Sequence, residues 1–295
     1  MNNSANKSKL STFILEDGNI RGAFIDSTKI VQEMQKAHNT GVLESIALGQ
    51  AYTAAGLLTV TQKGEDRLRL QVNCEGPLQG FLVESSAKGN VRGYLKTEAI
   101  EIEEAPESFD LAPFYGQGII RMTRYPEGAK QPYTSDSILY HSDLAKDLTR
   151  FFLNSEQIPT SFTLSVHLDT EGRVDGAGGL FLQALPAAQE LNLDSITADV
   201  YSLPSIGTAI AENQDMINIL KEVFSNHALE FIDEKEIRFS CPCSKERFAR
   251  ALISLPYSDR EDLLKNGPFP LPTQCHFCNA EYHFTEEELK ELFTE

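Results

Sequence analysis

The sequence predicts an α+β fold in three successive parts: a body of mixed helices and strands, a segment of short helices, and a small C-terminal module. Residues 11–184 combine helical and alternating apolar patterns, whereas residues 187–237 contain only short amphipathic stretches. Four of the five cysteines are confined to residues 241–278. With 295 residues and 41% apolar side chains, the chain is long enough for one large domain or two smaller ones.

The body begins with two expected helices, over residues 31–38 and 43–58. The second is rich in alanine and glycine, which lets neighbouring elements pack closely against it. Leu68, Leu70 and Val72 alternate with polar residues and predict a half-buried strand. Another helix is expected over residues 144–153, preceded by Ser142. The remaining strands are expected over residues 80–83, 91–94, 114–125, 162–168 and 180–185, the last of them after a turn at the glycine-rich residues 175–179.

Pro186 closes the body, and the pattern then changes to two short amphipathic helices over residues 195–203 and 215–224. Helices shorter than about 12–15 residues are marginal in water, so these two must dock on something. One interpretation is an ordinary linker packed on the body. The other is a metastable element, held down partly by the C-terminal module, whose apolar faces are released when that module unfolds.

The cysteines of the C-terminal module occur as Cys241-Pro242-Cys243 and as Cys275-His276-Phe277-Cys278. Residues 1–9 are polar and contain no apolar segment typical of a secretory signal, so a cytoplasmic location with reduced thiols is expected. In an extended segment, residues two apart point to the same side, and Cys-x-x-Cys forms a tight turn. Four thiolates are a common structural zinc set, which predicts one zinc ion held by all four. A disulfide framework is the alternative.

His276 and His283 lie near the second motif but are expected to be surface or packing residues, because four sulfurs already complete a tetrahedral site.

Three helices are expected in the module. Phe248, Leu252 and Leu255 lie on one helical face. Ser258 with Glu261 predicts a capping box at the start of a second helix, which Gly267 can end, and Thr285 with Glu288 predicts another at the start of the last helix. A module of about 60 residues buries little apolar surface and needs a covalent or metal cross-link.

Loss of the metal should therefore unfold the module, since structural zinc contributes about 10–16 kcal/mol and whole domains are stable by only about 5–15 kcal/mol. Oxidation is one way to lose it, because a disulfide cannot serve as a thiolate ligand. Each cysteine has a partner two or three residues away, which favours a reversible redox switch. The alternative is that zinc merely protects the thiolates.

Several classes of function are disfavoured. The net charge of −17 argues against binding to a nucleic acid backbone, and no apolar run is long enough to span a membrane. The chain lacks the P-loop, GxSxG and HExxH motifs, so no enzymatic activity is expected. Cys74 stands alone and is expected to be a small core residue.

The two cysteine motifs, with their spacing and flanking residues, resemble those of the heat shock protein 33 family of redox-regulated chaperones. The resemblance extends along the chain. Its N-terminal motifs are Ile20-Arg21-Gly22, His38-Asn39-Thr40, residues 49–58, Gly76-Pro77-Leu78-Gln79-Gly80, Gly89-Asn90-Val91-Arg92-Gly93-Tyr94 and residues 155–160. It implies a chaperone body with antiparallel sheets over residues 1–186, a metastable helical linker over 187–237, and a zinc redox-switch domain over 238–295.

The resemblance also implies a function. In this family the reduced, zinc-bound protein is inactive, and oxidants release zinc as disulfides form. The oxidised protein holds unfolding client proteins without ATP during stress, tends to dimerise, and passes clients to ATP-dependent chaperones after reduction. The implied ligands and sensors are Cys241, Cys243, Cys275 and Cys278, and the implied disulfides are Cys241–Cys243 and Cys275–Cys278.

One residue departs from the family pattern, since Asn279 stands where a glycine commonly follows the last cysteine. Asparagine tolerates the left-handed conformation, so the turn is expected to survive. Two other functions remain in view. One is a zinc-stabilised binding module without redox switching. The other is a thiol oxidoreductase, which the lack of a thioredoxin-like βαβ pattern disfavours.

Overall fold

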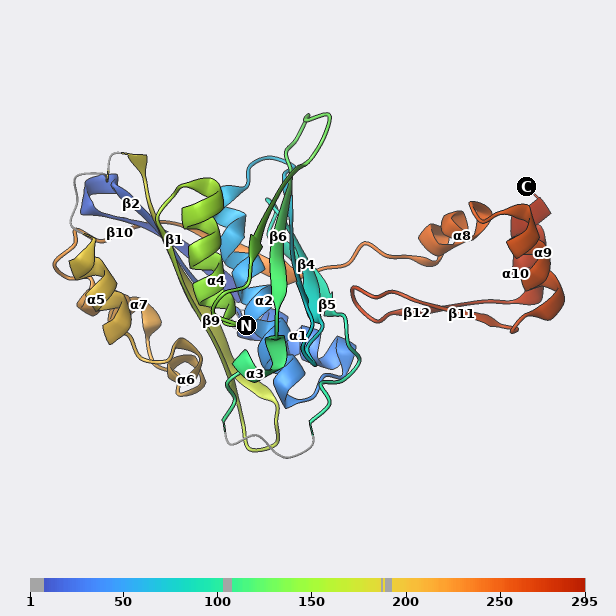
Figure 1. Ribbon diagram of the computed structural model, residues 1–295, viewed down its shortest axis with the longest axis horizontal. Coiled ribbons are helices and arrows are strands. Elements are labelled where there is room, and N and C mark those ends of the chain that lie inside the picture. The colour runs from blue at the N-terminus through green and yellow to red at the C-terminus, as the bar shows by residue number, and fades with distance from the viewer. Residues whose placement is uncertain (1–7, 103–107, 187, 189–192, 295) are drawn as a thin grey trace, which may run out of the picture. The chain divides into compact units, whose positions relative to one another are not determined.

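The computed structural model describes residues 8–102, 108–186, 188 and 193–294, and the chain divides into two compact units, Met1–Ser240 and Cys241–Glu295. The first unit contains one large sheet with helices on both of its faces (Figure 1). Its strands are β1 (Ser8–Leu15), β2 (Ile20–Asp26), β3 (Arg67–Cys74), β4 (Gly80–Ser86), β5 (Asn90–Leu95), β6 (Gly118–Tyr125), β7 (Tyr133–Ile138), β8 (Thr160–Leu168), β9 (Val174–Ala184) and β10 (Glu230–Phe239). Its helices are α1 (Thr28–His38), α2 (Val42–Leu58), α3 (Ala112–Tyr115), α4 (Leu144–Phe151), α5 (Asp194–Ser202), α6 (Ile206–Ala211) and α7 (Met216–Val223).

The sheet has ten strands in the order β7-β6-β3-β4-β5-β10-β1-β2-β9-β8. Neighbouring strands are antiparallel except β10 and β5, which are parallel and are joined through two residue pairs, Arg238 with Asn90 and Phe239 with Val91. On its other side β10 pairs antiparallel with β1 over most of its length. The predicted α+β body with antiparallel strands is therefore confirmed, and β10 joins its two halves.

Helices α1, α2 and α4 cover one face of the sheet and enclose the main core (Figure 1). The predicted helix over residues 43–58 corresponds to α2, which is buried along almost its whole length. Its small residues permit this close packing, as expected. A Cβ atom on Gly49 would lie 2.8 Å from Val31 Cγ1, and one on Gly56 would lie 2.6 Å from Ile25 Cδ1.

Helices α5, α6 and α7 cover the opposite face of the sheet, over β1, β2 and β9 (Figure 1). The side chains buried there form a second apolar core, which is separate from the first. Its members are Phe13, Leu15, Ile20, Phe24, Leu180 and Leu182 from the strands, and Ile196, Ile206, Ala209, Met216, Leu220 and Phe224 from the helical segment. The expected helices over residues 195–203 and 215–224 are confirmed as α5 and α7.

The turn expected at residues 175–179 is wrong, because these residues form the first half of strand β9. Their glycines serve close packing. A Cβ atom on Gly176 would lie 2.0 Å from the Gly207 carbonyl oxygen in α6, and one on Gly178 would lie 2.7 Å from Ile210 Cδ1. Glycine in a strand therefore marks the place where α6 crosses the sheet.

Other boundaries differ from expectation. The strand expected from residue 114 starts at Gly118, because residues 112–115 form the short helix α3. Helix α4 is capped by Asp143 and not by Ser142, since the Asp143 carboxylate accepts a hydrogen bond from the Lys146 amide. It ends at Phe151, and residues 152–156 continue as a single π-helical turn.

Strand β10 and helix α6 were not expected within residues 187–237. The sequence Glu230–Phe239 is highly charged, and only Ile237 among its residues is fully buried. The strand forms because its backbone pairs with β1, a partner more than 200 residues earlier. The division into a body, a linker and a redox domain at residues 186 and 237 stays a prediction.

His227 connects the helical segment to the turn between β1 and β2. Its Nδ1 lies 2.5 Å from Glu16 Oε1, and its Nε2 lies 2.7 Å from Asp199 Oδ2 on α5. The imidazole is 7% exposed and lies beside the ring of Phe224. Burial disfavours the charged form, but the hydrogen bonds to Glu16 and Asp199 outweigh it and raise the pKa of His227. Both ring nitrogens donate at once only in the imidazolium form.

This arrangement predicts that α5 loosens as the pH rises. A raised folded-state pKa means that the stabilisation is complete below about pH 6.5, the ordinary histidine value, and is lost as the pH passes the folded-state value. A hydrogen bond to a charged group contributes about 1.5–3 kcal/mol. Hydrogen exchange between pH 6 and pH 9, corrected for intrinsic rates, should show falling protection of residues 194–202.

His227→Gln should abolish this pH dependence of exchange. His167→Gln is the matched control, because His167 is hydrogen-bonded to one carboxylate, that of Asp175, and is more exposed. Equal pH profiles for the wild type and the His227→Gln variant would rule out the histidine contact as the cause.

Candidate metal centre

The second unit contains three helices and a two-stranded hairpin. These elements are α8 (Lys245–Ile253), α9 (Tyr257–Asn266), β11 (Leu271–Gln274), β12 (Glu281–Phe284) and α10 (Glu286–Thr294). The expected capping box at the last helix is confirmed: the Glu288 amide donates to Thr285 Oγ1, and the Thr285 amide donates to Glu288 Oε2. The box expected at Ser258 is wrong, because α9 begins at Tyr257 and its cap is Pro256, two residues before the expected cap.

The Cys275–Cys278 motif forms the turn between β11 and β12. The Cys275 amide donates to the Ala280 carbonyl oxygen, and the amides of Cys278 and Asn279 donate to the Cys275 carbonyl oxygen. Asn279 takes the left-handed conformation at φ 60°, as expected from its place in the motif. The hairpin thus presents both sulfur atoms at its tip.

Cys241 and Cys243 lie in the segment just before α8. Ser244 caps this helix by accepting a hydrogen bond from the Arg247 amide, so Cys243 immediately precedes the helix N-terminus. The positive end of the helix dipole stabilises negative charge at such a position. Lys245 adds a cation there and pairs with Glu288 of α10.

The structure brings all four predicted cysteines together, with their sulfur atoms within 4.8 Å of one another. Cys241 and Cys275 Sγ are 3.7 Å apart, and Cys243 and Cys278 Sγ are 3.3 Å apart. A tetrahedral zinc ion with Zn–S bonds of about 2.3 Å needs sulfur atoms about 3.8 Å apart. The four thiols therefore fit the ion, and their roles as ligands and redox sensors stay predictions.

The thiols differ in their surroundings. Burial raises the pKa of both Cys275 and Cys278. At Cys243 burial acts in the same direction but is outweighed by hydrogen bonds, that of the Tyr282 hydroxyl first, so the pKa of Cys243 is lowered. The surroundings of Cys243 thus favour a thiolate more than those of Cys275 and Cys278 do.

Tyr282 was not among the predicted site residues. Its hydroxyl oxygen lies 3.3 Å from Cys243 Sγ, and its ring packs against Phe248 of α8 with centroids 5.3 Å apart. It lies among the residues that flank the second cysteine motif, but nothing in the sequence marks it as a contact of Cys243, because its position follows from the hairpin register. The alternation of Tyr282 and Phe284 along β12 was the signal available.

Cys74, at the end of β3, lies outside the cluster and packs against the main core, as expected of a small apolar residue. Burial raises the pKa of the Cys74 thiol to about 11. Its thiolate fraction near pH 7.5 is therefore about 100-fold below that of an ordinary cysteine.

We expect iodoacetamide to modify Cys74 about 100-fold more slowly in the folded protein than in the protein unfolded by urea at the same pH. Mass spectrometry of the peptide that contains Cys74 gives both rates. Equal rates would show that the thiol is as reactive as an exposed one.

The fold and the cysteine cluster define a protein in which a large α+β unit precedes a small unit built around four thiols. A family model described as Hsp33 protein matches residues 8–285. The chain belongs to the Hsp33 family, and its class of function is that of a chaperone. This membership favours a non-enzymatic role.

Known relatives agree over nearly the full length. The chain is 33% identical over 286 residues to the 33 kDa chaperonin of Streptococcus pneumoniae (strain JJA), covering 96% of this chain and 98% of that protein. It is 31% identical over 277 residues to the 33 kDa chaperonin of Lachnoclostridium phytofermentans, covering 93% and 94%. The crystal structure of the 33 kDa chaperonin (heat shock protein 33 homolog) from Thermotoga maritima superposes with a TM-score of 0.88 at 29% identity, covering 98% of each chain.

Proposed function

We propose that this protein is a redox-regulated, ATP-independent holdase. In the reduced state Cys241, Cys243, Cys275 and Cys278 would hold one zinc ion; when bound, the ion cross-links the second unit and keeps the thiols as thiolates. Oxidation to disulfides would release the ion and unfold that unit. The observation that carries the proposal is the convergence of four thiols within 4.8 Å in a unit with little other core.

The small size of that core supports the switch. Among residues 241–294, only Cys275, Phe284 and Leu289 are buried, and α8 and α9 contain no buried residue. A unit with so little buried apolar surface depends on its cross-link for stability. The chain also connects the two units directly, since Cys241 follows the last residue of β10 by two positions.

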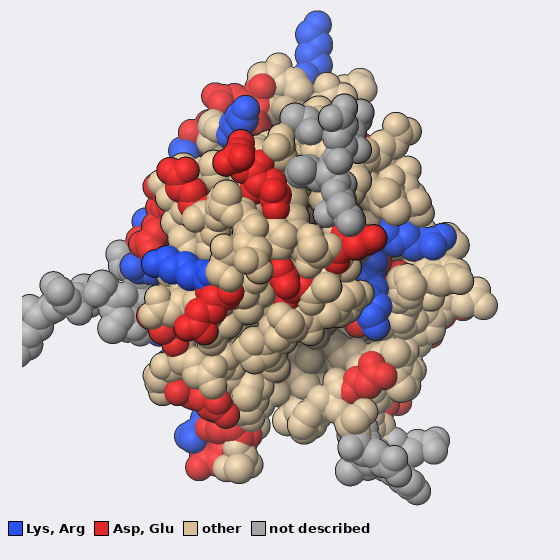
Figure 2. Space-filling model, turned by 90° about the vertical axis from the view of Figure 1, so that its left-hand side faces the viewer, with Lys and Arg blue, Asp and Glu red and all other residues tan. Residues whose placement is uncertain are grey.

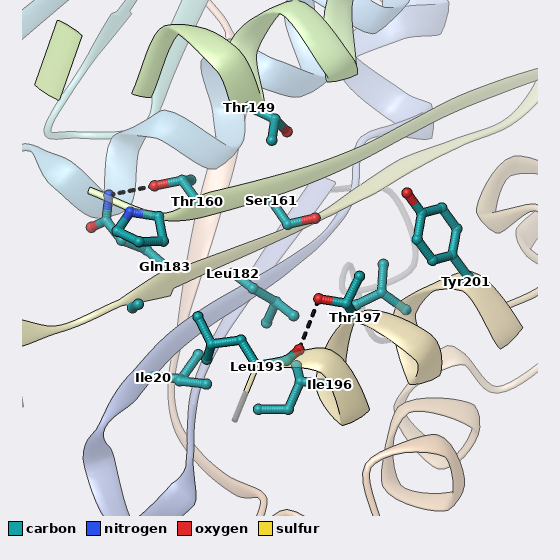
Figure 3. A pocket seen from close by; sticks show the side chains of 13 residues that line it. Ile20, Thr149, Thr160, Ser161, Leu182, Gln183, Leu193, Ile196, Thr197 and Tyr201 are labelled. Atoms are coloured by element: carbon teal, nitrogen blue, oxygen red, sulfur yellow. Dashed lines mark hydrogen bonds between the residues drawn. The ribbon is translucent and has the colours of Figure 1, made fainter. Parts of the chain in front are cut away.

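We further propose residues 187–237 as the metastable linker and client-binding element. A pocket of about 240 Å³ opens between α5 and the sheet, so part of this helix is not packed against the strands. In Figure 3, Ile20 and Leu182 of the sheet lie opposite Leu193 and Ile196 at the start of α5, around the pocket. Incomplete packing weakens the attachment of α5 to the sheet, because atoms that border the pocket lack the dispersion contacts that close packing would provide. Release of α5–α7 would expose the second apolar core to clients.

The proposed partners are unfolded proteins, a second copy of the oxidised chain, and an ATP-dependent chaperone system that receives clients after reduction. The proposed location is the cytoplasm. None of the described helices is long and apolar enough to cross a membrane. The side of the molecule that carries α5–α7 shows more Asp and Glu than Lys and Arg (Figure 2). With the net charge of −17, this surface supports a role without nucleic acid.

Light scattering of a thermally unfolding client tests the proposal. The reduced, zinc-loaded protein should leave aggregation unchanged, and peroxide pretreatment under mildly denaturing conditions should make the protein suppress it. Cys74→Ser should behave like the wild type. Equal behaviour of both redox forms would instead favour a zinc-stabilised binding module without switching. Peptide mapping of the oxidised protein should find the disulfides Cys241–Cys243 and Cys275–Cys278.

A further inference from the structure

The hydroxyl group of Tyr282 is held beside one sulfur of the cluster. The residue is fixed at two points: its backbone carbonyl oxygen accepts a hydrogen bond from Thr273 Oγ1 at 3.0 Å, and its ring packs on Phe248. Its hydroxyl oxygen then lies 3.3 Å from Cys243 Sγ, a normal distance for a hydrogen bond to sulfur. The hydroxyl has one hydrogen to donate, and a thiolate can only accept.

A hydrogen bond changes how a thiolate reacts. The sulfur lone pairs that accept the hydrogen are the same electrons that attack an oxidant. Such a bond to a charged acceptor is stronger than one between neutral groups, and it withdraws charge from the sulfur. Donation by Tyr282 therefore makes the Cys243 thiolate a weaker nucleophile.

We propose that Tyr282 is a positioning residue that slows the oxidation of the thiol cluster by donating its hydroxyl hydrogen to Cys243 Sγ. This inference rests on the proposed redox function and adds a rate-setting residue to it. The oxidant considered is a hydroperoxide.

The chemistry has two steps. One thiolate attacks an oxygen of hydrogen peroxide, so that an S–O bond forms, the O–O bond breaks, and hydroxide leaves. A second thiolate then attacks the resulting sulfenic sulfur, forming the S–S bond and releasing a second hydroxide. The two sulfur atoms lose two electrons in total, and the peroxide gains them. The Tyr282 proton stays on its oxygen throughout.

Tyr282→Phe removes the hydroxyl but keeps the ring that packs on Phe248. We expect the variant to lose zinc about three- to tenfold faster than the wild type in dilute hydrogen peroxide, given the usual strength of a charged hydrogen bond and the dependence of thiolate reactivity on basicity. Zinc release is followed with a colorimetric chelator. Dimedone added together with the peroxide traps sulfenic acid before disulfides form. Mass spectrometry should find more trapped Cys243 in the variant than in the wild type.

Two control variants separate this effect from loosening of the unit. Tyr257→Phe removes the hydroxyl of a tyrosine that is 72% exposed on α9, and it should change neither rate nor trapping. Thr273→Val weakens the hairpin but leaves the Tyr282 hydroxyl in the chain. It should speed the loss of zinc to a chelator in the absence of peroxide. In the presence of peroxide, dimedone trapping in this variant should show no preference for Cys243. Tyr282→Phe should leave that oxidant-free rate within about twofold of the wild type.

The outcomes are distinct. If the wild type holds no zinc, or keeps it in peroxide, the proposed function itself fails. If the wild type releases zinc and Tyr282→Phe matches it in rate and in trapping at Cys243, the role of Tyr282 is overturned. Equal increases in trapping at all four cysteines would also overturn it, because they would reflect general loosening.

Discussion

Removal of zinc from the reduced protein is expected to unfold residues 241–294 and to leave the sheet and the main core of the first unit folded. The reason is the contrast between the two cores. The first unit encloses two apolar clusters, whereas the described part of the second has three buried residues. A structural zinc ion contributes about 10–16 kcal/mol, which is more than so small a core supplies.

A strong chelator at neutral pH removes the zinc ion, and hydrogen exchange then reports which parts of the chain have unfolded. Amides of α8, α10 and the β11–β12 hairpin should lose protection, while those of α2 and β9 should keep it. Cys74→Ser should respond to the chelator as the wild type does, because Cys74 lies outside the cluster. Replacing Cys278 by serine should reproduce the chelator effect without a chelator. Persistent protection of the hairpin after metal removal would contradict the prediction.

Replacing Phe224 by alanine is expected to detach α5–α7 from the sheet without any oxidant. Phe224 is fully buried in the second core, with its ring centroid 6.4 Å from that of Phe13. Truncation of a buried phenylalanine costs about 3–5 kcal/mol. The exchange of amides in residues 194–223 should therefore accelerate by about two to four powers of ten. If the exposed surface binds clients, the reduced variant should suppress aggregation.

Phe81→Ala is the matched control, because Phe81 is equally buried but belongs to the main core on the other face of the sheet. It should lower the stability of the whole unit to a similar extent without selective exchange in α5–α7. Client suppression by both reduced variants would point to general unfolding. Unchanged exchange in the Phe224→Ala variant would show that the helices are held by other contacts.

The sequence predicted the parts of this structure that depend on local signals. Helix α2 was placed to within one residue, because its length and composition leave few alternatives. The four cysteines were predicted to converge, because their spacing suits two short ligand-bearing turns. The left-handed Asn279 and the capping box at Thr285 also follow from nearby residues.

The features that were missed depend on distant partners. Strand β10 is charged and alternates poorly, and it is a strand because β1 and β5 lie on either side of it. The glycines of β9 indicate a turn when only the sequence is considered. They are instead needed in the strand because α6 packs so closely on it that a side chain would not fit. His227 and Tyr282 acquire their contacts only when Glu16, Asp199 and Cys243 are brought to them by the fold.

The position of β10 has a consequence for synthesis on the ribosome. Its partner β1 ends at residue 15, but β10 begins at residue 230. At about 5–20 residues per second, roughly 10 to 40 seconds separate the appearance of the two strands. During that interval one edge of β1 has no partner from its own chain. An unpaired edge invites other strands, so a newborn copy of this chaperone is itself expected to need protection from aggregation.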